Sequence, residues 1–127
     1  MHLHFEFAEA EVAQCFWQDS DLHIRFSAAP LWPAENPQAE MVWAPMLLVA
    51  KNVESWGLLD TAQCMGKLRQ GAVLHASKRL QRLPLPCDLQ GVVTMELEFV
   101  QAGLVHVRCN QLTLRPVEGD VVSAYQC

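Results

Sequence analysis

The chain of 127 residues lacks the features by which membrane proteins and many enzymes are recognised from sequence. Its apolar runs are all well short of the roughly 18 residues that a membrane-spanning helix needs, so we expect no membrane span. There is no P-loop, no dinucleotide-binding fingerprint and no serine in a Gly-x-Ser-x-Gly turn, so no motif indicates phosphate binding or nucleophilic catalysis. The N-terminal segment has neither a basic region nor an apolar stretch, and we therefore expect no secretory signal and a cytoplasmic location.

The cysteines lack a recognisable pattern. There are five, at positions 15, 64, 87, 109 and 127, and no two of them form a Cys-x-x-Cys motif. An odd number at wide spacing argues against a disulfide framework and against a zinc ribbon. We expect free thiols, with Cys15 and Cys109 packed as small apolar side chains on strand faces.

Cations are scarce overall but concentrated in one stretch. The net charge of -5 disfavours nucleic acid as a partner, because phosphate binding depends on accumulated Lys and Arg. No acidic residue occurs between Asp60 and Asp88. The basic residues of that stretch are Lys67, Arg69, Lys78, Arg79 and Arg82. Two interpretations remain open: the cations neutralise acidic residues from elsewhere in the chain, or they form a surface for an anionic ligand or an acidic protein.

What the sequence does contain is two-residue periodicity, most clearly over residues 91–115. Apolar and polar residues alternate before and after Gln101-Ala102-Gly103, which is typical of two half-buried strands joined by a short glycine-containing loop. Centring that loop on Ala102 predicts five opposed pairs: Phe99 with Val105, Leu97 with Val107, Met95 with Cys109, Glu98 with His106, and Glu96 with Arg108. The inward positions shift after Cys109, which predicts a bulge at Asn110-Gln111.

Other segments extend the β pattern. Alternation in residues 3–7, 11–17 and 22–26 predicts a bend near residue 8 and a second hairpin around residues 18–21. Residues 46–57 fit either a strand or a helix, and the β-rich surroundings favour a strand. Residues 28–45 contain four prolines and predict a long loop that carries Trp32 and reaches Trp43. The whole chain, residues 1–127, is therefore expected to be one all-β domain: a small antiparallel β-barrel or β-sandwich built from hairpins, with at most one short helix.

Two histidine-containing patterns resemble parts of the cupin family. His2-x-His4 followed after four residues by Glu9 is similar to part of the first cupin motif, and Gly103, His106 and Asn110 match the end of the second. The resemblance implies a metal bound inside a barrel by such residues. Alternation in the 91–115 hairpin instead places His106 on the outer face with Glu98, whereas a metal ligand of the cupin type would point into the barrel. We assign no metal ligand and no catalytic residue.

These observations predict a non-catalytic binding or assembly module without a cofactor. Its contact surfaces would be the basic stretch 67–82 and the Trp/Pro loop 28–45, and the assigned residues are Trp32, Trp43, Lys67, Arg69, Lys78, Arg79 and Arg82. The partner would be a protein or a small anionic ligand, and edge-strand pairing would allow a homodimer. The alternative is a small-molecule-binding barrel or a metal-dependent enzyme of cupin-like type. A polar lumen with converging histidines would favour that alternative, and an apolar, filled core would favour the module.

Overall fold

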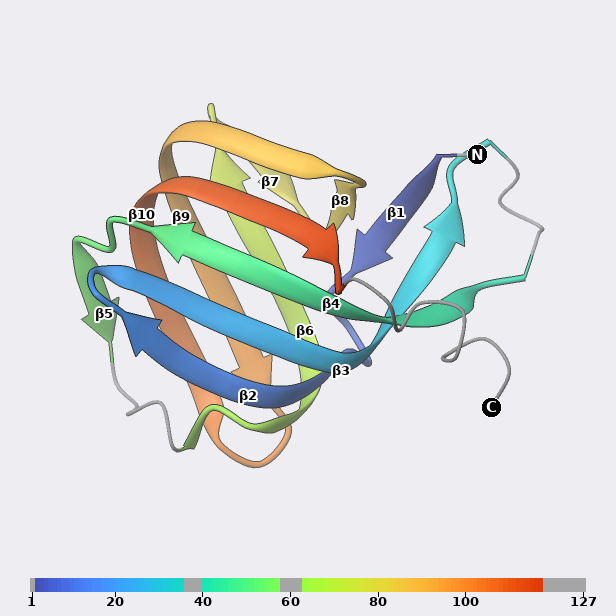
Figure 1. The fold of residues 1–127 in the computed structure, drawn as a ribbon, viewed down its shortest axis with the longest axis horizontal. Coiled ribbons are helices and arrows are strands. Elements are labelled where there is room, and N and C mark those ends of the chain that lie inside the picture. The colour runs from blue at the N-terminus through green and yellow to red at the C-terminus, as the bar shows by residue number, and fades with distance from the viewer. Residues whose placement is uncertain (1, 36–39, 58–62, 118–127) are drawn as a thin grey trace.

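The described part of the chain, residues 2–35, 40–57 and 63–117 of a computed structural model, contains ten β-strands and no α-helix (Figure 1). The strands are β1 (Leu3–Glu6), β2 (Glu11–Gln18), β3 (Asp21–Pro33), β4 (Val42–Lys51), β5 (Ser55–Gly57), β6 (Gly66–His75), β7 (Lys78–Leu80), β8 (Arg82–Pro84), β9 (Cys87–Phe99) and β10 (Gly103–Pro116). The all-β prediction is confirmed.

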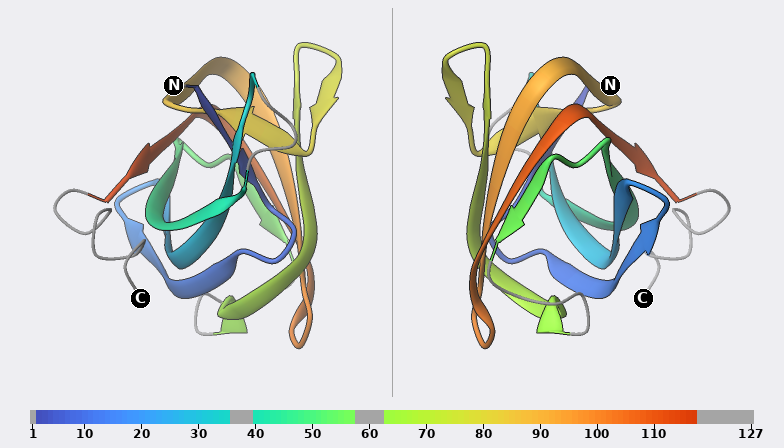
Figure 2. Two further views of the ribbon diagram at one scale, coloured as in Figure 1. Left: turned by 90° about the vertical axis from the view of Figure 1, so that its right-hand side faces the viewer. Right: turned by 90° about the vertical axis from the view of Figure 1, so that its left-hand side faces the viewer.

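Six of the strands close into an antiparallel barrel. They follow the order β2-β6-β9-β10-β4-β3, and β3 pairs back with β2 to complete the ring (Figure 1, Figure 2). Because the ring closes, the fold is a barrel and not a sandwich, the two alternatives that the sequence left open. Strands β5 and β7 pair with β10 and β6, and the hairpin of β6 and β7 projects beyond the rim of the barrel.

An arm extends from one end of the barrel. Strand β1 pairs on one side with the last residues of β3 and on the other side with β8, while the same end of β3 pairs with the beginning of β4. We call β8, β1, residues 29–33 of β3 and residues 42–44 of β4 the arm; it lies at the right of Figure 1. Bends in the chain produce it, since Glu9 has a positive φ of 75° and the β3–β4 register shifts between Phe26 and Ala29.

The β9–β10 hairpin forms as predicted, but its register differs from the prediction by two residues. Gly103 is opposite Phe99, Val105 is opposite Leu97 and Val107 is opposite Met95. Val100 belongs to the loop, and Gly103, with a φ of 91°, already belongs to the second strand. A shift of two residues preserves the inward and outward faces, because side chains alternate with a period of two.

The opposed charges in this hairpin therefore differ from the prediction. His106 is opposite Glu96, and Glu98 is opposite Leu104, so the predicted Glu98–His106 and Glu96–Arg108 pairs are wrong. The bulge after Cys109 is confirmed, since the register with β9 shifts between Cys109 and Gln111.

The predicted long loop over residues 28–45 is wrong in most of its described part. Strand β3 continues to Pro33 and β4 begins at Val42, so only residues 34–41 lie between them, and residues 36–39 of these lie outside the described residues. The prolines are tolerated because of where they occur: Pro33 is the last residue of β3, and Pro45 lies at the shift in the β3–β4 register. Strand ends and irregularities are the places where a missing N–H donor does not interrupt a ladder.

Other secondary-structure predictions are confirmed. Residues 46–51 belong to β4, which confirms the strand interpretation, and residues 18–21 form the β2–β3 turn. Residues 66–75 form one irregular strand, whose register with β9 shifts between Leu68 and Gln70. Strand β10 extends to Pro116, and residues 118–127 lie outside the described residues.

The interior of the barrel is apolar. Phe5 packs edge-on against Phe7 and Phe26, with ring centroids 4.9 and 5.2 Å apart, and all three side chains are fully buried. No polar or charged side chain is buried anywhere in the described part of the chain. Inward positions of the strands thus supply one continuous core, as expected where alternating residues line a small closed barrel.

Candidate functional site: the outer face of the arm

The structure distributes the seven sequence-assigned residues over five strands. Trp32 is in β3, Trp43 in β4, Lys67 and Arg69 in β6, Lys78 and Arg79 in β7, and Arg82 in β8. Three of them, Trp32, Trp43 and Arg82, belong to the arm. The other four lie on β6 and on the β7 hairpin next to it.

Strand register places the three arm residues on one face. Trp32 is opposite His4, and Arg82 is opposite Glu6 on the other side of the same strand. Trp43 is opposite Pro30, two residues before Trp32. Opposed residues share a face, as do residues two apart in a strand.

The opposite face of the arm belongs to the core. Phe5, Leu31 and Leu83 are opposed across β1, β3 and β8, and each is at most 1% exposed. On the other side of these strands Trp43 is 37% exposed, His4, Glu6 and Trp32 are partly exposed, and Pro30 is buried. We call the outward side, defined by His4, Glu6, Trp32, Trp43 and Arg82, the arm face.

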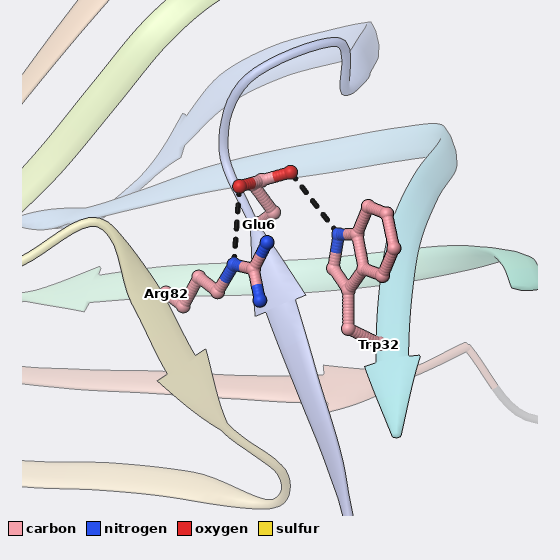
Figure 3. Close-up of polar contacts among 3 residues, drawn as sticks. All are labelled: Glu6, Trp32 and Arg82. Atoms are coloured by element: carbon pink, nitrogen blue, oxygen red, sulfur yellow. Dashed lines mark hydrogen bonds and ion pairs between the residues drawn. The ribbon is translucent and has the colours of Figure 1, made fainter. Parts of the chain in front are cut away.

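At the centre of the arm face, one carboxylate holds two side chains from different strands (Figure 3). Trp32 Nε1 donates a hydrogen bond to Glu6 Oε1 at 3.1 Å, and Arg82 Nε donates to Glu6 Oε2 at 3.1 Å. The Arg82 guanidinium carbon lies 4.9 Å from the centre of the Trp32 ring, a cation–π arrangement. The three contacts tie β1, β3 and β8 together and fix the orientation of the indole.

The other basic residues are mostly paired with acids. Lys67 Nζ lies 2.7 Å from Glu9, Arg69 Nε lies 3.3 Å from Glu98, and Arg79 Nη1 lies 3.5 Å from Glu96. The contact with Glu9 raises the pKa of Lys67. These pairs fit the interpretation that the basic stretch neutralises acids from elsewhere in the chain. Among the residues placed by the structure, Lys78 has no acidic partner.

A small pocket lies beside the arm, between β1 and β6. It has a volume of about 240 Å³ and is lined by Glu6, Ala8, Arg69, Gln70, Gly71 and Gln81. The shift in register between Leu68 and Gln70 allows Arg69 and Gln70 both to be exposed, although they are consecutive. Glu6 belongs both to this pocket and to the arm face.

The histidine patterns are not accompanied by a metal-binding cluster within residues 2–35, 40–57 and 63–117. No three His, Cys, Asp or Glu side chains there are grouped so as to hold a metal ion. Glu9, which the cupin resemblance implies as a ligand, pairs with Lys67 instead. His106 lies between buried Val105 and Val107 and opposite Glu96, on the outward side of its strand.

The thiols of the barrel are buried. Cys15, Cys64, Cys87 and Cys109 form no disulfide. A hydrogen bond with Cys64, followed by burial, holds the pKa of Cys15 far above its usual range, and burial raises the pKa of Cys109. Burial, with a smaller contribution from the negative charge of Asp88, raises the pKa of Cys87 to about 11. Thiols that resist ionisation are poor nucleophiles.

Sequence reasoning missed Glu6, His4 and Gln81 as parts of the candidate site. Glu6 contacts a tryptophan 26 positions away and an arginine 76 positions away. The local pattern gives Glu6 only the outward position of an ordinary strand. Its importance comes from β3 and β8 lying on either side of β1.

Comparison with known proteins adds no assignment. No protein-family model matches the chain, and no curated protein or solved structure shows significant similarity to it. In the part of the chain that is described, no helix has the length and apolar character of a transmembrane span.

Proposed function

We propose that this chain is a non-catalytic binding module that recognises a protein partner through the arm face, with acidic side chains of the partner meeting the cations of β7 and β8. The observation that carries the proposal is the strand register that places Trp32, Trp43 and Arg82 together on one outward face. Tryptophan and arginine are the residues most enriched among those that dominate binding energy at protein interfaces.

The interior supports a module rather than a lumen enzyme. Phe5 packs against Phe7 and Phe26 inside the core, and the core in the described part holds no buried polar side chain. A ligand site inside a barrel needs polar groups that converge on a cavity. The outer wall therefore offers the better surface for recognition.

The contacts on the arm face reduce the conformational entropy that would be lost when a partner binds. Trp32 is held by Glu6 and Arg82 before any partner arrives, so little side-chain freedom would be lost on binding. Arg82 uses Nε for Glu6, and its two terminal nitrogens are not part of that bond. A guanidinium carries five N–H donors, so Arg82 can donate to a partner carboxylate while keeping its contact with Glu6.

The test is affinity purification of the tagged full chain from its native cells, with identification and quantification of the co-purifying protein. Trp43→Ala, and separately Lys78→Ser, Arg79→Ser and Arg82→Ser combined, should reduce recovery of that protein about tenfold, the effect of losing roughly 1.4 kcal/mol of binding free energy. Far-UV circular dichroism should be unchanged, because these side chains lie outside the core.

Trp17→Ala is the matched control for Trp43→Ala. Trp17 is 41% exposed, close to the 37% of Trp43, and it lies near the end of β2, away from the arm (Figure 1). Recovery of the partner should be unaffected by this control. A partner recovered equally well with all the variants, or no specific partner at all, would contradict the proposal.

A further inference from the structure

The pocket between β1 and β6 is lined by side chains of opposite charge. Glu6 belongs to β1, and Arg69 belongs to β6. Gln70 and Gln81 add amide groups, and Gln70 Nε2 already donates to Glu98 Oε1 at 2.7 Å. The small side chain of Ala8 leaves room in the hollow of about 240 Å³. The pocket is therefore polar and of a size suited to a small molecule, not to a folded partner.

Both charged groups retain hydrogen-bonding positions that a ligand can use. Arg69 Nε forms an ion pair with Glu98 Oε2 at 3.3 Å, and its terminal nitrogens are not part of that contact. Each Glu6 oxygen accepts one hydrogen bond, from Trp32 or from Arg82, whereas a carboxylate oxygen offers two lone pairs. A ligand can thus bind without breaking the contacts that hold the arm together.

We infer that this pocket binds a small zwitterion of the α-amino acid type, with its carboxylate on Arg69 and its ammonium group on Glu6. A guanidinium pairs with a carboxylate through two parallel N–H donors, and a carboxylate accepts from an ammonium group, so Arg69 and Glu6 complement the two charged ends of such a ligand. The amides of Gln70 and Gln81 lie at the same pocket and supply further polar contacts.

The same geometry disfavours ligands of a single charge. A simple anion would be attracted by Arg69 but repelled by the negative charge of Glu6. A simple cation would be attracted by Glu6 but repelled by Arg69. Since the side chains are partly exposed, at 60% for Arg69 and 25% for Glu6, solvent screens each attraction. We expect a dissociation constant on the order of 1 mM for the zwitterion.

The test is an NMR titration of the ¹⁵N-labelled full chain with L-alanine, compared with N-acetyl-L-alanine, which keeps only the carboxylate, and L-alaninamide, which keeps only the ammonium group. L-alanine should produce saturable shifts at the amides of Gln70, Gly71 and Gln81. The two single-charge analogues should bind at least about fivefold more weakly. Equal affinity for all three compounds, or no localised shifts up to about 100 mM L-alanine, would overturn the inference.

Substitutions identify the groups responsible. Arg69→Gln and Glu6→Gln should each weaken L-alanine binding about tenfold, as expected for the loss of one charge-assisted contact. Arg79→Gln makes the same charge change on the neighbouring hairpin, outside the pocket, and should leave the affinity unchanged.

Ala8→Leu is a second test, in case removal of Glu6 loosens the arm. It fills part of the pocket without changing any charge and should also abolish the shifts. Unaltered binding by Arg69→Gln, Glu6→Gln or Ala8→Leu would show that the compound binds elsewhere.

This inference does not rest on the proposed protein partner. Trp43→Ala should leave L-alanine binding unchanged while it reduces partner recovery, because Trp43 does not line the pocket. The two proposals can therefore fail separately.

Discussion

At the residue scale, Gly71 shows how closely the N-terminal segment packs on the barrel. A Cβ atom placed on Gly71 would lie 2.8 Å from Phe7 Cβ, 2.9 Å from Phe7 Cγ and 3.1 Å from Leu97 Cδ2. The nearest atom belongs to the rigid base of the Phe7 side chain, so it has little room to retreat. Glycine is required here for close approach, not for a positive φ.

We predict that Gly71→Ala lowers the free energy of unfolding by about 1–3 kcal/mol, the usual cost of overpacking a core. Urea denaturation followed by tryptophan fluorescence measures this difference. Gly57→Ala is the control, because no atom lies within 4 Å of a Cβ placed there, and it should change the free energy of unfolding by less than about 0.5 kcal/mol. Equal stability of the two variants would contradict the packing of Phe7 on Gly71.

Cys87 gives a prediction for the dependence of stability on pH. Its pKa rises from an ordinary value of 9.0 to about 11 in the folded chain. The unfolded thiol therefore ionises first, so the stabilising contribution is complete below pH 9 and is lost as the pH rises through about 11. By pH 11 the ionisation of Cys87 should have lowered the free energy of unfolding by about 2 kcal/mol, since one pKa unit corresponds to about 1.4 kcal/mol.

Comparison of the wild type with Cys87→Ala isolates this contribution from other groups that titrate at high pH. The difference in free energy of unfolding between the two proteins, measured in urea at intervals from pH 8 to 11, should shift by that amount in favour of the variant. A difference that is constant across this range would show that the Cys87 thiol ionises equally easily in the folded and unfolded chains.

At the scale of elements, the seam between β2 and β6 is the weakest contact in the ring of the barrel. Only Glu11 with Lys67 and Val12 with Gly66 are paired there, supplemented by backbone hydrogen bonds of Leu68 with Ala10 and Glu9. The β9–β10 pair instead continues from Gly103 to Leu114 with a single shift. Short pairing leaves few contacts to break, so local opening should begin at the seam.

Hydrogen exchange tests this difference between elements. The amides of Leu68 and Glu9, which donate across the seam at 2.9 and 3.0 Å, should exchange faster than those of Val105 and Val107 in the paired part of the β9–β10 hairpin. NMR-detected exchange at neutral pH measures the rates for all four residues. If the seam amides are protected as strongly as those of Val105 and Val107, the barrel opens as one unit.

The outer edge of β8 illustrates how an element avoids unwanted pairing. Leu85 N donates to Leu3 O, and hydrogen-bonded residues alternate along an antiparallel pair. Pro84, opposite His4, therefore occupies a position whose backbone nitrogen faces away from β1. Proline has no N–H to offer there, so the free edge of β8 is a poor template for another strand.

At the scale of the whole molecule, apolar side chains lie inside the barrel and charged side chains lie on its outer surface. The core is apolar throughout its described part, while Glu6, Glu9, Glu96 and Glu98 pair with cations on the outside. Exposed ion pairs contribute little to stability, about 0–1 kcal/mol each. The fold therefore depends on the filled core, and the outer wall is free to carry recognition.

The fold could be predicted to a considerable depth. Alternation identified β9, β10 and residues 22–26 of β3 together with the buried side of each, because side-chain period in a strand is a local property. It located β2 but not the register shifts between Glu11 and Gln14 that change which of its side chains are buried. The hairpin register was wrong by two residues because both registers bury the same side chains. The pattern constrains the face but not the loop length.

The candidate site could be predicted only as separate residues. The aromatic and basic side chains stood out by composition, but their grouping depends on β1 lying between β3 and β8, far apart in sequence. The proline count suggested a loop at residues 28–45, yet Pro33 and Pro45 occupy positions in strands that need no donor. Local propensity has no means of distinguishing such positions.

The sequence alone determined that this chain forms antiparallel strands around one apolar interior, since burial of alternating side chains requires it. Only the tertiary structure decided that the ring closes through β2 and β6, that Trp32, Trp43 and Arg82 share a face, and that Glu6 and Arg69 line one pocket. The physical reason is that closure and grouping depend on contacts between distant segments, whose geometry arises from bends and register shifts that no single segment encodes.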